Sequence, residues 1–238
     1  MRNKLTSLTV VIVCIGLNGM VHGADDSKPV DTAAFKGTIR MVCIGDSITK
    51  GVGADRTVCY AALIKNALGG KWDVTNLGVT GATLLRNGDK PYHKLAPYAK
   101  ALEIKPDVAT IALGTNDSKP GNWSKKAEFE ADYKTMIKEL RNANSNVNVY
   151  CCLPPPVGAN KWSMSGDVMK NEIIPLIRTI AKDTKCYTID LYESLDGRNG
   201  FARQDLVHPN NDGHKLMAAT VFKALTGRDI TAEVPKNK

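Results

Sequence analysis

Short apolar runs alternate with longer stretches of helical periodicity over most of this chain, and this alternation limits the possible folds most strongly. The runs cover residues 39–44, 72–77, 107–113, 147–153 and 186–189. Each run is rich in apolar residues and is bounded by turn residues. Such runs are typical of strands that are buried on both faces of a parallel sheet.

The stretches between and after these runs carry apolar residues at helical spacing. Four such stripes are Tyr60, Leu63, Ile64, Ala67 and Leu68; Phe129, Tyr133, Met136, Ile137 and Leu140; Ile173, Ile174, Ile177, Ile180 and Ala181; and Met217, Val221, Ala224 and Leu225. Pro175 must lie in the first turn of the third stripe or kink that helix. Alternating strands and helices predict an α/β fold, a three-layer α/β/α sandwich with a five-stranded parallel sheet.

The N-terminus has the pattern of a secretory signal peptide. Arg2 and Lys4 precede an apolar run over residues 8–17, and Val21 and Gly23 occupy the −3 and −1 positions of a cleavage site after Gly23. The run is shorter than the roughly 20 residues that a membrane-spanning helix needs. We therefore expect a secreted or periplasmic protein without a membrane span.

The remaining chain divides into three parts by its composition. We expect a loose leader over residues 24–37, one folded domain over 38–227 and a polar tail over 228–238. Removal of residues 1–23 lowers the formal net charge from +8 to +6. The positive charges are spread along the chain, which disfavours a nucleic-acid interface and slightly favours an acidic polymer as partner. The oligomeric state is left open.

The cysteines left after signal removal indicate neither a disulfide framework nor a zinc site. Their number is odd, and no two of them are spaced as Cys-x-x-Cys. They are Cys43, Cys59, Cys151, Cys152 and Cys186. Most lie in apolar stretches, where cysteine behaves as a small buried hydrophobic residue. One disulfide is possible in an oxidising compartment, and the sequence does not identify its pair.

Ser47 follows the first predicted strand and precedes a helix. Ligands of open α/β sheets bind at the carboxyl ends of the strands, so this position suits a nucleophile. A serine here is also a common helix N-cap, which is the structural alternative.

His208 and Asp205 lie before the last predicted helix, in the segment Asp-Leu-Val-His-Pro. A serine nucleophile needs a base such as imidazole, and the imidazole needs an acceptor on its other nitrogen. An aspartate three residues earlier can supply that acceptor. The alternative is an Asp/His pair that only caps the helix. His93 and His214 have no comparable acidic partner, and we expect them to be structural or exposed.

Donors for an oxyanion follow the second and third strands. Gly78 could bring its N–H close to a ligand because it has no side chain, and Asn116 could offer its amide. With the N–H of Ser47, these would form an oxyanion hole of three donors. Taken singly, Gly78 is as readily a turn residue and Asn116 a cap.

Together these segments resemble the GDSL/SGNH hydrolase family. The pattern is GDS at residue 45, N-x-G at 76, GTND at 114 and D-x-x-H at 205, in the order of that family. It covers roughly residues 39–226. Ile48 stands where many members have leucine. The resemblance implies a flavodoxin-like fold and an esterase with Ser47, His208 and Asp205 as its triad, with no metal or organic cofactor.

The loops after the second, third and fourth strands are similar to those of exported members described as carbohydrate or sialate O-acetylesterases. This similarity makes hydrolysis of an O-acetyl ester on a carbohydrate our first expectation. Asp117, Trp123 and Trp162 are the candidate substrate contacts in these loops, although each tryptophan is equally suited to packing.

Two other functions remain open, and a third is disfavoured. A lysophospholipase or thioesterase could use the same triad, and a glycan-binding module could retain the fold without activity. A metal phosphohydrolase built on Asp46, Asn116, Asp117 and His208 lacks the residues for a two-metal site.

Overall fold

The structure, a computed structural model, describes residues 27–197 and 205–230. Its centre is a parallel sheet with the strand order β2-β1-β3-β4-β5. The strands are β1 (Ile39–Gly45), β2 (Trp72–Gly78), β3 (Val108–Ala112), β4 (Asn148–Leu153) and β5 (Tyr187–Asp190). All five predicted strands are confirmed to within one residue at either end. The predicted signal peptide lies outside the described residues, as does the end of the polar tail.

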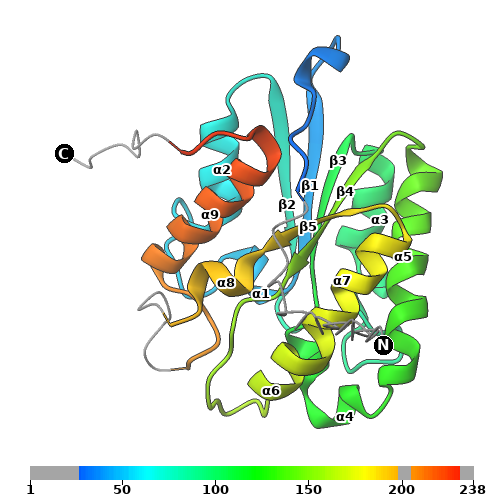
Figure 1. The fold of residues 1–238 in the computed structure, drawn as a ribbon, viewed down its shortest axis with the longest axis vertical. Helices are drawn as coiled ribbons and strands as arrows, with labels where there is room; N and C mark the ends of the chain where they lie inside the picture. Colours follow the sequence, from blue (N-terminus) through cyan, green and yellow to red (C-terminus); the bar gives the residue numbers. More distant parts are fainter. Residues whose placement is uncertain (1–26, 198–204, 231–238) are drawn as a thin grey trace, which may run out of the picture.

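Helices cover both faces of the sheet, which gives three layers (Figure 1). The α-helices are α1 (Ser47–Lys50), α2 (Tyr60–Leu68), α3 (Ala96–Ile104), α4 (Pro120–Trp123), α5 (Phe129–Ala143), α6 (Gly166–Val168), α7 (Ile174–Asp183), α8 (Leu191–Leu195) and α9 (Asn211–Thr226). Single turns of 3-10 helix are η1 (Thr32–Ala34), η2 (Tyr92–Lys94), η3 (Asn116–Ser118) and η4 (Lys126–Glu128), and η5 (Met169–Ile173) is π-helical. The predicted α/β/α sandwich is therefore confirmed.

Alternate residues of the strands feed two separate hydrophobic cores. Val42 and Ile111 lie in the core beneath α3, α5 and α7, whereas Met41 and Tyr150 lie in the core beneath α2, α8 and α9. Successive side chains of a strand point to opposite faces. Both faces are buried, which explains why the strands read as continuous apolar runs rather than as alternating patterns.

The four helical stripes correspond to α2, α5, α7 and α9, and Pro175 does lie in the first turn of α7. Among the described α-helices, α3 and α8 were not predicted, and neither were the shorter α4 and α6. The α3 segment mixes Lys and Glu with alanines, begins with Pro97 in its first turn and buries only Tyr98 and Ala101. The α8 segment is only five residues long. Neither segment has a clear apolar stripe, so their helices depend on packing against the sheet.

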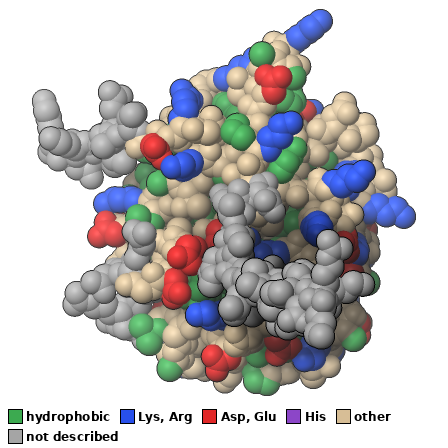
Figure 2. All heavy atoms as spheres, viewed as in Figure 1, with side chains coloured by type: hydrophobic (Ala, Val, Ile, Leu, Met, Phe, Trp, Pro, Cys, Tyr) green, Lys and Arg blue, Asp and Glu red, His purple; other side chains and the backbone are tan. Residues whose placement is uncertain are grey.

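Charged side chains of both signs share the surface. On the face drawn in Figure 2, Lys and Arg side chains are interspersed with Asp and Glu, and the hydrophobic side chains form small separate groups. This distribution agrees with the expectation from the sequence that positive charge is not concentrated on one element. No helix among the described residues is long and apolar enough to cross a membrane.

The ends of β1 and β2 pack closely against α1, and glycines permit this contact. Gly45 and Gly78 are neighbours in the sheet. A Cβ atom on Gly78 would lie 2.2 Å from the backbone nitrogen of Lys50 and 2.6 Å from the carbonyl carbon of Thr49. Because both are backbone atoms, they cannot move aside as a flexible side chain could. The short helix that begins with Ser47 is thus held against the sheet by a contact that only glycine allows.

We expect Gly78→Ala to lower the free energy of unfolding by about 1–3 kcal/mol, because the added methyl group overpacks this contact. Urea unfolding monitored by circular dichroism measures the change. Gly70→Ala is the matched control, since a Cβ atom there would meet nothing within 4 Å. Equal stability of the two variants would contradict the tight contact.

Candidate active site

Ser47 is the first residue of α1 and is almost completely buried, at 3% exposure. The side chain that caps this helix is that of Asp46, whose Oδ1 accepts the N–H of Ile48 at 2.8 Å. Ser47 is therefore not the N-cap, and its hydroxyl is left for another partner. Burial raises the pKa of Asp46 to about 6, although hydrogen bonds from Ile48 and Thr115 oppose this shift.

His208 supplies that partner. Its Nε2 lies 2.8 Å from the Ser47 Oγ, and its Nδ1 lies 2.8 Å from the Asp205 Oδ2. The other carboxylate oxygen of Asp205 accepts the N–H groups of Val207 and His208, both at 2.9 Å. The capping alternative does not apply, because Asn210 caps α9 through its side chain. The structure thus brings together the three residues that the sequence singled out, of which Ser47 and His208 are 161 positions apart in the chain.

The carboxylate of Asp205 is held in its ionised form. Partial burial opposes ionisation, but the N–H groups of His208 and Val207 and the His208 ring outweigh it, so the pKa of Asp205 lies below its ordinary value. An ionised acceptor on Nδ1 fixes the tautomer of the ring, which leaves Nε2 to accept a proton from the serine.

Gly53 was not predicted as a site residue, and it allows the His208 segment to approach the loop after α1. Its φ of +95° is in the left-handed region that favours glycine. A Cβ atom there would lie 2.5 Å from the Pro209 carbonyl oxygen and 2.9 Å from the His208 Cβ. The spacing Gly51-Val52-Gly53 after the serine helix is the signal that could have pointed to it.

Of the expected oxyanion donors, Asn116 lies beside the serine segment. Its Nδ2 donates to the Ala82 carbonyl oxygen at 3.1 Å and, through a long bond of 3.4 Å, to the Asp46 Oδ2. The N–H of Ser47, at the first position of a helix, has no acceptor within that helix.

Gly78 is placed differently from our expectation. Its N–H donates to the Oδ1 of Asn76 at 2.9 Å, within the end of β2. This bond argues against Gly78 as an oxyanion donor and leaves it the packing role described above. Gly81, three residues further, has a φ of +79° and precedes Ala82, the residue that binds the Asn116 amide. Among the hydrogen bonds of the described residues, its N–H has no acceptor.

Two of the three expected substrate contacts are buried and serve the packing of loops. Asp117 is fully buried, and its two oxygens accept the N–H groups of Leu84 at 3.0 Å and Leu85 at 2.8 Å. Burial raises its pKa to about 7, against the effect of these two bonds. Trp123 packs edge-to-face on Phe129 and donates its Nε1–H to Glu172. Neither residue is exposed to a substrate, and burial of this kind cannot be read from the sequence.

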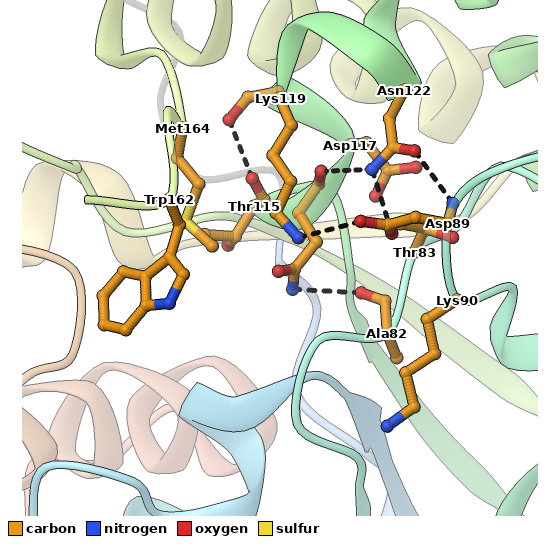
Figure 3. Close-up of polar contacts among 12 residues, drawn as sticks. Ala82, Thr83, Asp89, Lys90, Thr115, Asp117, Lys119, Asn122, Trp162 and Met164 are labelled. Atoms are coloured by element: carbon orange, nitrogen blue, oxygen red, sulfur yellow. Dashed lines mark hydrogen bonds and ion pairs between the residues drawn. The ribbon is translucent and has the colours of Figure 1, made fainter. Parts of the chain in front are cut away.

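Trp162 is the third expected contact, and it does face the site. Its ring is 36% exposed and lies edge-on to the His208 ring, with centroids 5.5 Å apart. The loop of residues 158–164 that carries it is organised by Asn160, whose Oδ1 accepts the N–H groups of Trp162 and Met164 and whose Nδ2 donates to the carbonyls of Gly158 and Met164. Figure 3 shows Trp162 and Met164 on one side of this area and Lys119 and Asp89 on the other.

The remaining histidines and the cysteines lie apart from this arrangement. His214 is buried and stacks on Tyr60, and burial lowers its pKa to about 4. His93 has a buried Nδ1 without a partner among the described residues. Among the described residues, Cys43, Cys59, Cys151 and Cys186 carry free thiols.

The described residues contain no group of three or more His, Cys, Asp or Glu side chains that could hold a metal ion. The absence of a cofactor remains an expectation from the family resemblance.

Residues 43–216 match the GDSL-like lipase/acylhydrolase family. The match covers most of the chain, which therefore belongs to this family, and the resemblance seen in the sequence is confirmed.

Similar proteins include the acetylxylan esterase of Xylanibacter ruminicola, which is 35% identical over 206 residues, covering 79% of this chain and 43% of the relative. The cellulase/esterase CelE of Acetivibrio thermocellus is 26% identical over 222 residues, covering 82% of this chain and 25% of the relative.

Solved structures share the fold. The acetyl xylan esterase AlAXEase superposes with a TM-score of 0.60 at 26% identity, covering 78% of this chain and 99% of that one. This chain spans less than half the length of the two curated relatives above. Their names agree with the expectation of a carboxylic ester hydrolase.

We expect Asp117→Asn to lower the free energy of unfolding by about 1–3 kcal/mol, because the amide NH₂ would face a backbone N–H and leave a buried donor unpaired. Thermal or urea unfolding measures the loss. Asp73→Asn, at an exposed position of β2, is the control. If both variants are as stable as the parent, Asp117 does not hold the loop.

Proposed function

We propose that this protein is an exported serine esterase that removes short acyl groups, O-acetyl in the first place, from a carbohydrate. The observation that carries this proposal is the continuous hydrogen-bonded chain from the Ser47 Oγ through the His208 ring to Asp205, with 2.8 Å at each of its two links. This chain lies at the carboxyl end of β1, where open α/β sheets bind their ligands.

The reaction would proceed by acyl transfer. Ser47 Oγ attacks the ester carbonyl carbon while His208 Nε2 takes the hydroxyl proton. His208 then donates that proton to the leaving alcohol, and the acyl group remains on Ser47. Water, deprotonated by the same nitrogen, attacks the acyl-serine and releases the carboxylic acid.

The negative charge on the carbonyl oxygen needs donors that are already in place. We assign this role to the N–H of Ser47, the side-chain amide of Asn116 and the N–H of Gly81 in place of Gly78. Asn116 holds the Asp46 carboxylate only through its long bond of 3.4 Å, so this amide hydrogen is the one that an oxyanion could recruit.

A short acyl group is supported by the scarcity of exposed apolar surface. Among the described residues, only Trp162 and Leu206 are large apolar side chains with substantial exposure. Each buried CH₂ of an acyl chain contributes about 0.8 kcal/mol of binding, and two side chains cover few of them. The carbohydrate is supported by the exposed ring of Trp162 next to His208, which could stack on a sugar, and by the names of the relatives.

We expect Ser47→Ala to reduce the hydrolysis of p-nitrophenyl acetate by at least about 10⁴-fold, because it removes the nucleophile. Release of p-nitrophenol measures the rate, and circular dichroism checks the fold. Ser145→Ala, in an exposed turn, is the control that should retain full activity. Undiminished turnover by Ser47→Ala would refute the assignment. A parent protein without esterase activity would favour a glycan-binding module.

A series of p-nitrophenyl esters tests the acyl group. We expect kcat/KM for acetate to exceed that for octanoate by at least about tenfold, because the site offers little apolar surface to a long chain. The opposite order, with rates rising toward eight carbons, would favour a lysophospholipase or thioesterase on the same triad.

A further inference from the structure

A hollow of about 520 Å³ lies beside the proposed active site, and the esterase mechanism does not use it. Its lining comes from the loops after β2, β3 and β4, and includes Asp89, Lys119, Gly121, Asn122, Lys125 and Ser163. The volume is within the range of pockets that hold small ligands, about 300–1,000 Å³. Most of the lining residues are polar or charged, whereas most of the atomic surface that they expose to the hollow is apolar.

Three side chains of the lining, those of Asp89, Lys119 and Asn122, hold one another in a fixed arrangement (Figure 3). Asn122 accepts the Asp89 N–H at 2.8 Å and donates to the Asp89 Oδ1 at 3.1 Å. Lys119 Nζ lies 3.0 Å from the Asp89 Oδ2. Partial burial opposes ionisation of Asp89, but Lys119 and Asn122 outweigh it and hold its pKa below the ordinary value. An ionised carboxylate is thus fixed next to an ammonium group.

This pair offers hydrogen-bond acceptors and donors side by side. The Asp89 side chain is 51% exposed and retains lone pairs, and the Lys119 ammonium has donors beyond the one that binds Asp89. Two adjacent hydroxyl groups of a sugar, each able to donate and accept, match such a pair. The Asp89 carboxylate would repel a phosphate or sulfate placed at the same point, and the second lysine of the lining, Lys125, already donates to the Asn87 carbonyl oxygen. A neutral sugar therefore fits the hollow best.

Two chains of contacts connect the hollow to the proposed active site. Asn122 Nδ2 donates to the Asn116 carbonyl oxygen at 2.8 Å, and the Asn116 side chain reaches Asp46, the neighbour of Ser47. On the other side, Ser163 in the lining directly follows Trp162, whose ring lies against His208. A sugar chain with its ester at Ser47 could pass Trp162 and reach the hollow.

We propose that this hollow is a second sugar subsite, which binds an unesterified residue of the same glycan chain through two adjacent hydroxyl groups. The identity of the ligand rests on the proposed function. The subsite makes the enzyme select oligosaccharides over single sugars, because a monosaccharide that places its ester at Ser47 cannot also fill the hollow.

Gly121→Trp tests the proposal by filling the hollow. A Cβ atom on Gly121 would meet nothing within 4 Å, and its φ is outside the left-handed region, so the tryptophan can be built without backbone strain. Gly70→Trp is the matched control, since its surroundings are equally open and it lies before β2, at the opposite edge of the sheet. Thermal unfolding checks that both variants fold.

Calorimetry with unacetylated oligosaccharides of one to six units, from neutral xylose, glucose and mannose series, measures binding without turnover. We expect affinity in at least one series to rise with length, and Gly121→Trp to weaken binding of its hexamer at least about tenfold, whereas Gly70→Trp does not. We also expect Gly121→Trp to lower the ratio of kcat/KM for the acetylated hexamer to that for p-nitrophenyl acetate at least about tenfold.

Equal binding of the hexamer by Gly121→Trp and the parent would overturn the subsite, as would the absence of binding in all three series. An unchanged ratio of kcat/KM would overturn it as well. The proposed esterase function is tested separately. If the protein hydrolyses no ester but its binding of the oligosaccharide still depends on Gly121, the esterase function is refuted and the sugar subsite is supported.

Discussion

The parallel arrangement of five strands is the constraint on which the rest of this structure depends. Parallel strands end at a common edge, and here β2 and β3 lie on opposite sides of β1, so the chain departs from β1 in two directions. The segments that follow β1, β2 and β3 all leave the sheet at this same edge. Ser47, Asn116 and Gly81 are therefore brought to one place by topology, before any contact between their side chains is considered.

At this edge α1 packs so closely against the ends of β1 and β2 that a side chain would collide with the backbone, and glycine avoids the collision. The paired residues Gly45 and Gly78 sit where α1 turns back over the sheet, and a side chain on Gly78 would collide with backbone atoms. Buried carboxylates hold the surrounding segments: Asp46 fixes the start of α1, and Asp117 binds two N–H groups of the loop after β2. The Asp46 bond stabilises the serine segment from within, whereas the Asp117 bonds attach the segment after β3 to the loop after β2.

The sequence revealed the strands and the Ser47, His208 and Asp205 arrangement because each has a local signal. An apolar run marks a strand, and the Asp-x-x-His spacing folds back on itself within one turn. The helices α3 and α8 have no such signal, since their positions depend on the sheet beneath them. Gly78 and Gly81 both follow the second predicted strand, and the sequence does not record which of their N–H groups is already bonded to Asn76. The polar side chain of Asp117 and the aromatic side chain of Trp123 suggested contacts with a substrate. In the structure both residues are buried, and their polar groups bind other residues of the protein instead.

The family of this chain and its proposed chemistry depend on different parts of the molecule. Membership follows from the match over residues 43–216 and from the fold. The choice of substrate depends on the loops after β2, β3 and β4, which carry Asp89, Lys119 and Trp162. These loops form the hollow and the exposed ring, and they are the parts in which members with one fold can differ in what they bind.

The loop that carries Trp162 is stabilised mostly from within, by the four hydrogen bonds of the Asn160 side chain. Its tie to the histidine segment is a backbone bond from the Gly158 N–H to the Leu206 carbonyl, which does not depend on side-chain identity. Natural variation could therefore replace the aromatic ring or reshape this loop without disturbing the hydrogen bond between Ser47 and His208. The proposed selectivity for a substrate and the proposed acyl-transfer chemistry can therefore change independently of each other in evolution.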